Sequence, residues 1–216
     1  MRPVICLITD GRLDAGDAAA AALLDTVRSA AAAGVHLIQL RGRHLDDGVL
    51  AALARQCVDA VRGTRTRIIV NDRVDVALAA GAHGVHLRGD SFAAARVRAI
   101  VPPGFLVGRS VHSAGEAAAC GAGDAIDYLM FGTVFATASK PGRQPLGAAV
   151  LAEAVRATIV PVLAVGGVTI VTAAAVAGAN AAGIAAIGLF ADRTPQAMAA
   201  DVARLTRAFD TPRPGS

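Results

Sequence analysis

The sequence predicts an α/β protein, a single (β/α)8 barrel of the TIM type. Short apolar runs alternate with alanine-rich segments of helical length along nearly the whole chain. The runs are rich in Val, Ile and Leu, as expected of strands in a parallel sheet that is covered on both faces. Eight such runs within 216 residues favour closure into one barrel.

Each expected strand is one of these apolar runs. The strands are Val4–Thr9, Leu37–Leu40, Arg67–Asn71, Gly84–Leu87, Leu106–Ser110, Tyr128–Phe131, Val162–Val165 and Gly183–Ile187. An open, doubly wound sheet is the alternative. That fold usually carries a glycine-rich dinucleotide-binding turn after its first strand, whereas this chain reads Thr9-Asp-Gly-Arg12 there.

Capping residues indicate where several helices begin and end. The helices expected from these signals are Asp17–Ala33, Asp46–Arg62, Ser113–Cys120 and Thr169–Ala177. Ser113 and Glu116 have the spacing of a capping box, and Thr169 is a candidate N-cap. Ala-Gly pairs predict left-handed C-terminal caps at Gly34, Gly81 and Gly178.

Composition excludes several classes of function. Aromatic residues make up 3% of the chain and Trp is absent, which argues against a surface that stacks nucleic-acid bases. The net charge of +4 comes from Arg spread along the sequence rather than from a basic stripe. Val168–Ala191 is apolar, but we interpret it as a helix followed by a strand rather than a membrane span.

These observations give a set of expectations about organisation and location. Residues 1–210 should form one domain and residues 211–216 a flexible tail. Three widely spaced cysteines without zinc-site spacing suit reduced thiols in the cytoplasm. No nucleic-acid or membrane partner is expected, and a homo-oligomer is left open.

In a parallel barrel, the chemistry lies at the carboxyl ends of the strands. Polar residues at the ends of the second, third and fifth strands are therefore candidate site residues: Gln39, Arg41, Asn71, Ser110 and His112. Of the five histidines, His112 follows a strand directly at this rim. His36 and His83 precede strands, and His86 lies within one and could face either side.

The last two strands end in glycine and predict a phosphate site. Gly166-Gly167 follows the seventh strand, and Ile187-Gly188 ends the eighth. Glycine backbone N–H groups at this place are a recurrent phosphate site in such barrels. Lys140 is the only lysine in the chain, and Thr137 and Ser139 lie beside it. These three side chains are expected to close over the same anion.

A set of motifs resembles the thiamine phosphate synthase/TenI family from about Val4 to Phe190. The motifs are Gln39-Leu-Arg41, Asn71-Asp-Arg-Val-Asp-Val-Ala-Leu78, Gly84-Val-His-Leu87, Ser110-Val-His112-Ser, Phe131-Gly-Thr-Val-Phe-x-Thr137-x-Ser139-Lys140 and Val165-Gly-Gly167. The resemblance implies a phosphorylated thiazole as a small-molecule substrate. It also implies one of two activities.

The synthase branch couples a hydroxymethylpyrimidine diphosphate to a thiazole phosphate with Mg2+. The resemblance implies that Gln39 and Arg41 grip the diphosphate, although Gly42-Arg43 stands where that branch has Glu-Lys. Gly188 likewise stands in place of a Ser.

The two aspartate ligands of Mg2+ in the synthase branch are matched only in part. Asp72 matches the first, but Ser91 falls at the second position. Asp90 lies one residue earlier and could serve only if its loop shifted. A cation held by a diphosphate usually takes carboxylate ligands, so only the synthase interpretation calls for a metal, at Asp72 and Asp90.

The TenI branch tautomerises a thiazole carboxylate phosphate without metal. The segments around Asp90-Ser91-Phe92 and Gly108–Glu116 are closer to this branch, in which the residue matching His112 is a proposed acid/base group. Histidine suits a proton shuttle near neutral pH, and Arg41 suits a substrate carboxylate. The preferred hypothesis is therefore a cofactor-free thiazole tautomerase with His112 as the catalytic residue.

Two alternatives stay open. The first is a thiamine phosphate synthase that uses Mg2+ through altered ligands. The second is a non-catalytic protein that binds a phosphorylated ligand on the same barrel. Diphosphate release that depends on Mg2+ separates the synthase from the tautomerase. Ligand binding without turnover indicates the non-catalytic protein.

Overall fold

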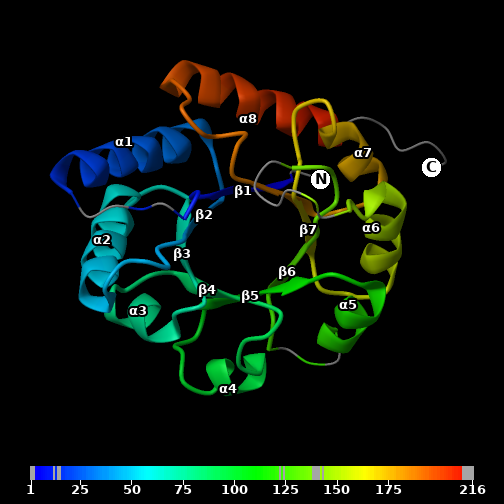
Figure 1. Cartoon of the computed structure of the whole chain (residues 1–216), viewed down its shortest axis with the longest axis horizontal. Helices are drawn as coiled ribbons and strands as arrows, with labels where there is room; N and C mark the ends of the chain where they lie inside the picture. Colours follow the sequence, from blue (N-terminus) through cyan, green and yellow to red (C-terminus); the bar gives the residue numbers. More distant parts are fainter. Residues whose placement is uncertain are drawn as a thin grey trace.

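The computed structural model describes residues 3–11, 13, 16–121, 123, 125–137, 142 and 144–210. In these ranges, parallel strands β1 to β8 form a closed barrel in sequence order. Helices surround the strands on the outside (Figure 1). The predicted (β/α)8 TIM barrel is confirmed. The expected tail, residues 211–216, lies outside the described residues.

The observed strands match the predicted ones to within one residue. They are β1 (Val4–Ile8), β2 (Leu37–Leu40), β3 (Arg67–Asn71), β4 (Gly84–Leu87), β5 (Leu106–Val111), β6 (Tyr128–Phe131), β7 (Val162–Val165) and β8 (Gly183–Ala186). The helices are α1 (Asp17–Ala33), α2 (Asp47–Ala60), α3 (Val74–Ala79), α4 (Ala94–Arg98), α5 (Ala114–Cys120), α6 (Gly147–Arg156), α7 (Ala173–Gly178) and α8 (Pro195–Asp210).

Several helix ends follow the predicted capping chemistry. The Ser113 side chain accepts a hydrogen bond from the Glu116 N–H at 3.1 Å, as the capping box requires. Asp46 is the N-cap of α2, and its side chain accepts from the Gly48 N–H. Gly34 ends α1 in the left-handed conformation, with a φ of 89°.

The predicted limits of α7 are wrong. The Thr169 and Thr172 side chains and backbones bond to each other in a local turn, so the helix begins only at Ala173. Gly178 is the last residue of α7 rather than its left-handed cap. The left-handed residue is Asn180, with a φ of 58°, and asparagine tolerates this conformation better than most residues.

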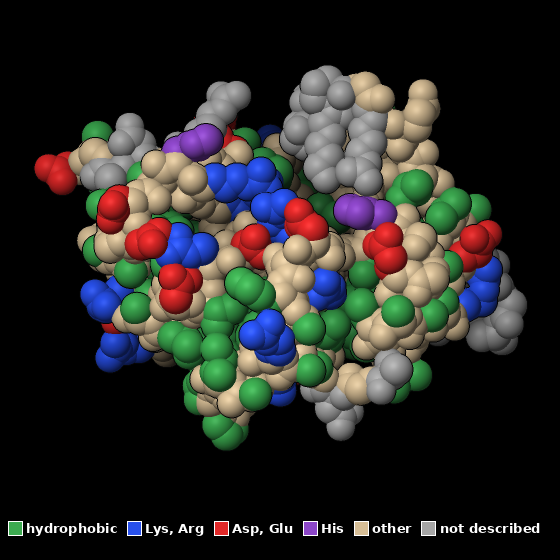
Figure 2. All heavy atoms as spheres, turned by 60° about the horizontal axis from the view of Figure 1, so that its bottom comes forward, with side chains coloured by type: hydrophobic (Ala, Val, Ile, Leu, Met, Phe, Trp, Pro, Cys, Tyr) green, Lys and Arg blue, Asp and Glu red, His purple; other side chains and the backbone are tan. Residues whose placement is uncertain are grey.

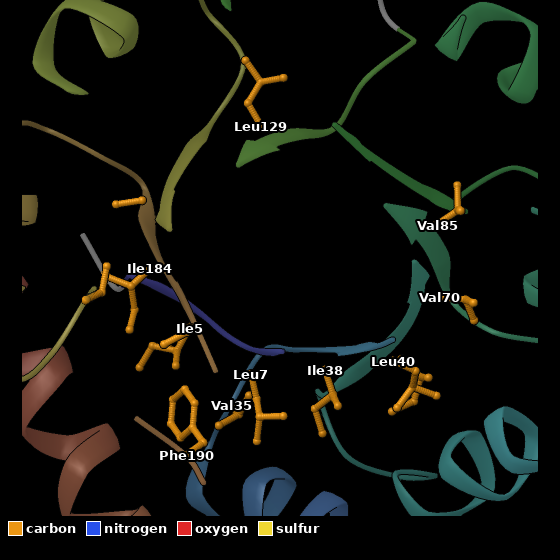
Figure 3. Close-up of a cluster of buried hydrophobic side chains, with 14 of the residues drawn as sticks. Ile5, Leu7, Val35, Ile38, Leu40, Val70, Val85, Leu129, Ile184 and Phe190 are labelled. Carbon is orange, nitrogen blue, oxygen red and sulfur yellow. The ribbon is translucent and has the colours of Figure 1, made fainter. Parts of the chain in front are cut away.

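The core has two layers because strand side chains alternate between the faces of the sheet. One set of side chains points away from the barrel axis toward the helices, as Ile38, Leu40 and Val70 do in Figure 3. The other set fills the barrel interior with a smaller cluster: Cys6, Ile8, Leu37, Ile69, Tyr128, Met130, Leu163 and Ala185. Both layers are needed before the rim has a fixed shape.

Side chains at the amino end of the barrel bind backbone N–H groups of neighbouring strands. The residues just before β2, β4 and β6 accept hydrogen bonds from β1, β3 and β5. The bonds are Ile5 N–H to His36 Nδ1 (3.2 Å), Ile68 N–H to His83 Nδ1 (3.0 Å) and Val107 N–H to Asp127 Oδ2 (2.7 Å). His36 and His83 are therefore structural acceptors at the end opposite the rim.

The apolar segment Val168–Ala191 contains α7 and β8, as the sequence predicts. Across the described part of the chain, no helix has the length and apolar character needed to cross a membrane. Cytoplasmic location stays a prediction.

Gly183→Ala should destabilise the barrel. A Cβ at Gly183 would lie 1.9 Å from the Val4 carbonyl oxygen, where β8 pairs with β1. Forcing the two strands apart should lower the free energy of unfolding by about 3 kcal/mol, measured by urea denaturation. In the matched control Gly178→Ala, the Cβ meets no atom within 4 Å, so stability should not fall. Equal losses in both variants would contradict the prediction.

Candidate active site

The carboxyl ends of the strands bring the predicted polar residues to one rim of the barrel. Asn71 ends β3, Ser110 is the second-last residue of β5, and Arg41 directly follows β2. The Gln39 side chain is buried just below the rim, with its Nε2 3.9 Å from the Met130 Sδ. Figure 2 shows charged and histidine side chains gathered in the upper half of the face it presents.

The Gly166-Gly167 turn after β7 packs directly against the segment that follows β6. The Val134 N–H donates to the Val165 carbonyl at 3.0 Å, and the Phe135 N–H donates to the Gly166 carbonyl at 2.9 Å. A Cβ at Gly167 would lie 2.3 Å from the Ala136 carbonyl oxygen, and its φ is 64°. Glycine is therefore required at this turn both for close approach and for conformation.

This packing bears on the predicted phosphate site. The segment after β6 leads to Thr137, which the structure describes, but the predicted site residues Ser139 and Lys140 lie outside the described residues. Gly188 follows β8, and a Cβ there would meet no atom within 4 Å. The structure thus brings the glycine turns to the same rim, as predicted. The contribution of Lys140 stays a prediction.

His112 lies just past β5 with one ring nitrogen engaged. Its Nδ1 contacts the carbonyl oxygen of Gly132, and its backbone N–H donates to Glu116 Oε2 at 2.7 Å. A carbonyl oxygen can only accept, so the contact requires the proton on Nδ1. In the neutral ring, Nε2 then carries a lone pair, which is the arrangement that a general base needs.

Ser91, rather than Asp90, faces Asp72. The Ser91 hydroxyl contacts Asp72 Oδ1 and accepts from the Arg88 N–H at 3.1 Å. Asp90 Oδ2 is instead 2.6 Å from Arg88 Nη2, and Arg88 Nη1 is 3.8 Å from Asp72 Oδ2. A guanidinium therefore lies between the two carboxylates. With Phe92, these residues line a hollow of about 340 Å³.

Arg109 fixes the loop that carries Ser91. It extends from β5, and its guanidinium donates to the carbonyls of Gly89 at 2.8 Å and Phe92 at 3.0 Å. Both acceptors are backbone atoms on either side of Asp90 and Ser91. The loop is thus anchored at two points, and the positions between them face the hollow.

Arg41 is a partly buried positive charge at the end of β2. Burial lowers the pKa of Arg41, and the charge of Arg43 lowers it further, whereas Asp10 acts in the opposite direction. An arginine stays protonated even so, and reduced solvation strengthens its attraction for an anion. This environment suits the predicted contact with a diphosphate or a carboxylate.

His86 is a polar residue that the sequence analysis left unassigned. It points into the barrel interior and is 2% exposed. Its Nδ1 is 3.2 Å from the Tyr128 hydroxyl, and its Nε2 is 2.8 Å from the Ser110 hydroxyl. The alternation of side chains along β4 could have predicted this orientation. The neighbouring Val85 and Leu87 belong to the layer packed against the helices, so His86 faces the opposite side.

Comparisons with known proteins agree with this geometry. The family model described as thiamine monophosphate synthase (TMP-TENI) matches residues 5–190. The thiamine-phosphate synthase of Roseiflexus castenholzii is 40% identical over 187 residues, covering 86% of this chain and 80% of that protein. That of Methanoculleus marisnigri is 42% identical over 164 residues, covering 76% and 77%.

The solved structures agree as well. Thiamine phosphate pyrophosphorylase from Pyrococcus furiosus superposes with a TM-score of 0.80 at 28% identity, covering 95% of this chain and 96% of that one. This chain belongs to the thiamine monophosphate synthase family. The predicted family resemblance is confirmed, and with it a place in thiamine biosynthesis. Because the relatives are named synthases, the comparisons favour the synthase alternative over the tautomerase preferred from the sequence.

The synthase branch of the family implies Mg2+, and the residues present fit a cation that arrives with the substrate phosphates. A magnesium ion carried by substrate phosphates takes one or two carboxylates from the protein. Asp72 supplies one, and the adjacent Ser91 hydroxyl is a neutral oxygen donor. In the described ranges, no three His, Cys, Asp or Glu side chains form a cluster.

Acid should destabilise the protein through His86. Burial, reinforced by the charge of Arg41, lowers the pKa of His86 to about 3 from an ordinary 6.5. Between these values the unfolded chain binds a proton that the folded protein excludes. Stability at neutral pH is therefore unaffected, and it falls as the pH drops below 6.5, by up to about 1.4 kcal/mol per pH unit.

This dependence can be measured by urea denaturation across that pH range. His86→Gln removes the titrating group, so its free energy of unfolding should fall less steeply with acid than that of the wild type. Parallel pH profiles for the two proteins would show that another group controls acid unfolding.

Proposed function

We propose that this chain is a thiamine-phosphate synthase, which couples a hydroxymethylpyrimidine diphosphate to a thiazole phosphate and releases diphosphate. The observation that carries the proposal is the arrangement of the rim. The predicted diphosphate residues Gln39 and Arg41 and the carboxylate of Asp72 lie at the same end of the barrel as the Gly166-Gly167 turn. A relative that is 40% identical over 187 residues carries that name.

The diphosphate end of the substrate would lie near β2, β3 and β4. Arg41 and Arg88 supply positive charge there, and the buried Gln39 amide is placed to orient an oxygen. Asp72 and Ser91 would hold Mg2+ on the diphosphate. When bound, the cation neutralises the charge of the leaving diphosphate. This chain's own residues position the diphosphate and screen part of its charge.

The thiazole phosphate would lie at the other side of the rim, after β7 and β8. The backbone of Gly166, Gly167 and Gly188, next to Ile187, is suited to close approach by a phosphate. Thr137, Ser139 and Lys140 would complete the phosphate contacts from the segment after β6, as the sequence predicts. Two anionic groups on opposite sides would hold the reacting groups near the axis.

Thiazole tautomerisation is the second candidate, and a specific observation favours it. The Gly132 carbonyl holds His112 in the tautomer that leaves Nε2 as a base. Replacement of a metal-ligand carboxylate by Ser91 also weakens the case for Mg2+. Such a tautomerase would use His112 to remove and return the ring proton and would need no cofactor.

A paired turnover assay separates the reactions. Purified protein should couple the pyrimidine diphosphate to the thiazole phosphate with Mg2+, and EDTA should abolish the reaction.

Asp72→Asn should reduce kcat/KM by roughly tenfold or more, because it removes the carboxylate that would lie beside the cation. Ser91→Asp should restore a second carboxylate and lower the Mg2+ concentration required. Tautomerisation that is indifferent to EDTA, with no coupling, would reverse the assignment. Binding without either turnover would indicate a non-catalytic protein.

His112→Gln tests the second candidate directly. If coupling is the activity, the variant should retain most of its kcat, because no step requires a protein base at that position. If tautomerisation is the activity, kcat should fall by roughly 10²–10⁴-fold, the usual contribution of a positioned acid/base. Substrate affinity measured by calorimetry should change little in either case, which controls for misfolding.

A further inference from the structure

A buried chain of hydrogen bonds leads from the barrel interior to the rim. It runs from the Tyr128 hydroxyl through both ring nitrogens of His86 to the Ser110 hydroxyl, over distances of 3.2 and 2.8 Å. Tyr128 and His86 are 5% and 2% exposed, whereas Ser110 is half-buried at the end of β5. Among these groups, Ser110 is therefore the one that a ligand can contact.

Strand register makes the chain of bonds possible. His86 is paired with Gly108, and Gly108 is paired with Tyr128, so the three residues lie in line across β4, β5 and β6. A Cβ at Gly108 would lie 2.1 Å from Tyr128 Cζ. Glycine thus leaves the space through which the tyrosine ring reaches His86. The two rings are stacked at 5.6 Å between centroids.

The protonation states of the two buried groups are fixed by their surroundings. His86 is 2% exposed and its two ring nitrogens contact neutral hydroxyl groups, so the buried imidazole is neutral. Burial also raises the pKa of Tyr128 well above its ordinary value, so the phenol keeps its proton. A neutral imidazole has one N–H and one bare nitrogen. The chain of bonds can therefore run in one of two directions.

The direction follows from the buried phenol. Within the described residues, the strong hydrogen-bond acceptor within reach of the Tyr128 hydroxyl is His86, and the nearby Cys6 thiol is a weak one. A buried O–H without an acceptor is destabilising. Tyr128 therefore donates to Nδ1, the ring proton lies on Nε2, and Nε2 donates to Ser110. The hydroxyl proton of Ser110 is left to point away from His86.

We propose that Tyr128 and His86 are positioning residues that hold Ser110 as a hydrogen-bond donor toward the rim, so that this position selects a substrate atom that accepts. Oxygens of a diphosphate, which accept hydrogen bonds, meet this requirement, whereas an ammonium group of a competing ligand, which can only donate, does not. The proposal rests on the proposed function, because it takes Ser110 to contact the substrate.

The tautomer can be tested without any ligand. Nitrogen-15 NMR of histidine-labelled protein reports which ring nitrogen carries the proton, and the His86→Gln spectrum identifies the His86 signals. The expected result is a proton on Nε2 and a bare Nδ1. A proton on Nδ1 would overturn the proposal. This outcome does not depend on whether the chain is a synthase.

The effect on binding is tested with inorganic pyrophosphate and Mg2+ by calorimetry. Ser110→Ala and Tyr128→Phe should each raise the Kd by roughly tenfold, as for a lost bond to a charged group. The double variant should be no weaker than Ser110→Ala alone, because Tyr128 acts through Ser110. An unchanged Kd in Tyr128→Phe, or a further loss in the double variant, contradicts the relay.

Thr66→Val is the matched control. Thr66 is 4% exposed and donates to the Val35 carbonyl at 2.7 Å, at the amino end of the barrel. Its loss removes a buried hydroxyl bond of the same kind, so stability should fall while the Kd for pyrophosphate stays unchanged. If the wild type itself does not bind pyrophosphate, the proposed function fails, and the NMR result alone decides the relay.

Discussion

Closure of the barrel leaves little space inside it, and polar side chains fit where a glycine on a neighbouring strand has no Cβ. Gly183 allows β8 to approach β1, and Gly108 admits the ring of Tyr128 beneath the rim. Gly132 lies against the Val165 carbonyl, where a Cβ would be 1.9 Å from the oxygen. The same close approach presents the Gly132 carbonyl to His112. Packing and site geometry therefore depend on the same backbone contacts.

The charges of the rim balance one another in pairs. Arg88 lies between Asp72 and Asp90, and Arg41 lies under the opposing influences of Arg43 and Asp10. Such pairs are partly exposed and contribute little to stability. Their effect is to hold positive charge beside the hollow that Asp72, Arg88 and Asp90 line.

The strands could be predicted closely because each is a continuous apolar run, and burial on both faces allows few other interpretations. Because the ends of the strands could be predicted, the positions of Gly166-Gly167 and Gly188 after the last two strands could be predicted as well. The orientation of His86 could not be predicted from its own residue type, since a histidine suits either face. It required the alternation with Val85 and Leu87 to be set against a closed barrel. The start of α7 was missed because Thr169, the predicted N-cap, bonds instead to Thr172 in a turn before the helix.

The arrangement of Asp72, Asp90 and Ser91 could be predicted only in part. The sequence placed Ser91 at the position of a ligand, but whether Asp90 could replace it depended on the path of the loop. Arg109, which is distant in the sequence, anchors that path through the Gly89 and Phe92 backbone carbonyls. No local pattern around Asp90 reports this contact. The pairing of Ser91 with Asp72 became visible only with the fold.

The anchoring by Arg109 has an evolutionary consequence. Its guanidinium recognises the Gly89 and Phe92 carbonyls, which are backbone atoms, so this anchor does not use the side chains at positions 90 and 91. An exchange of carboxylate for hydroxyl at these positions leaves both anchoring carbonyls in place. The loop can in this way exchange the chemical groups that it presents to the hollow in small steps, each of which leaves a folded protein for selection to act on.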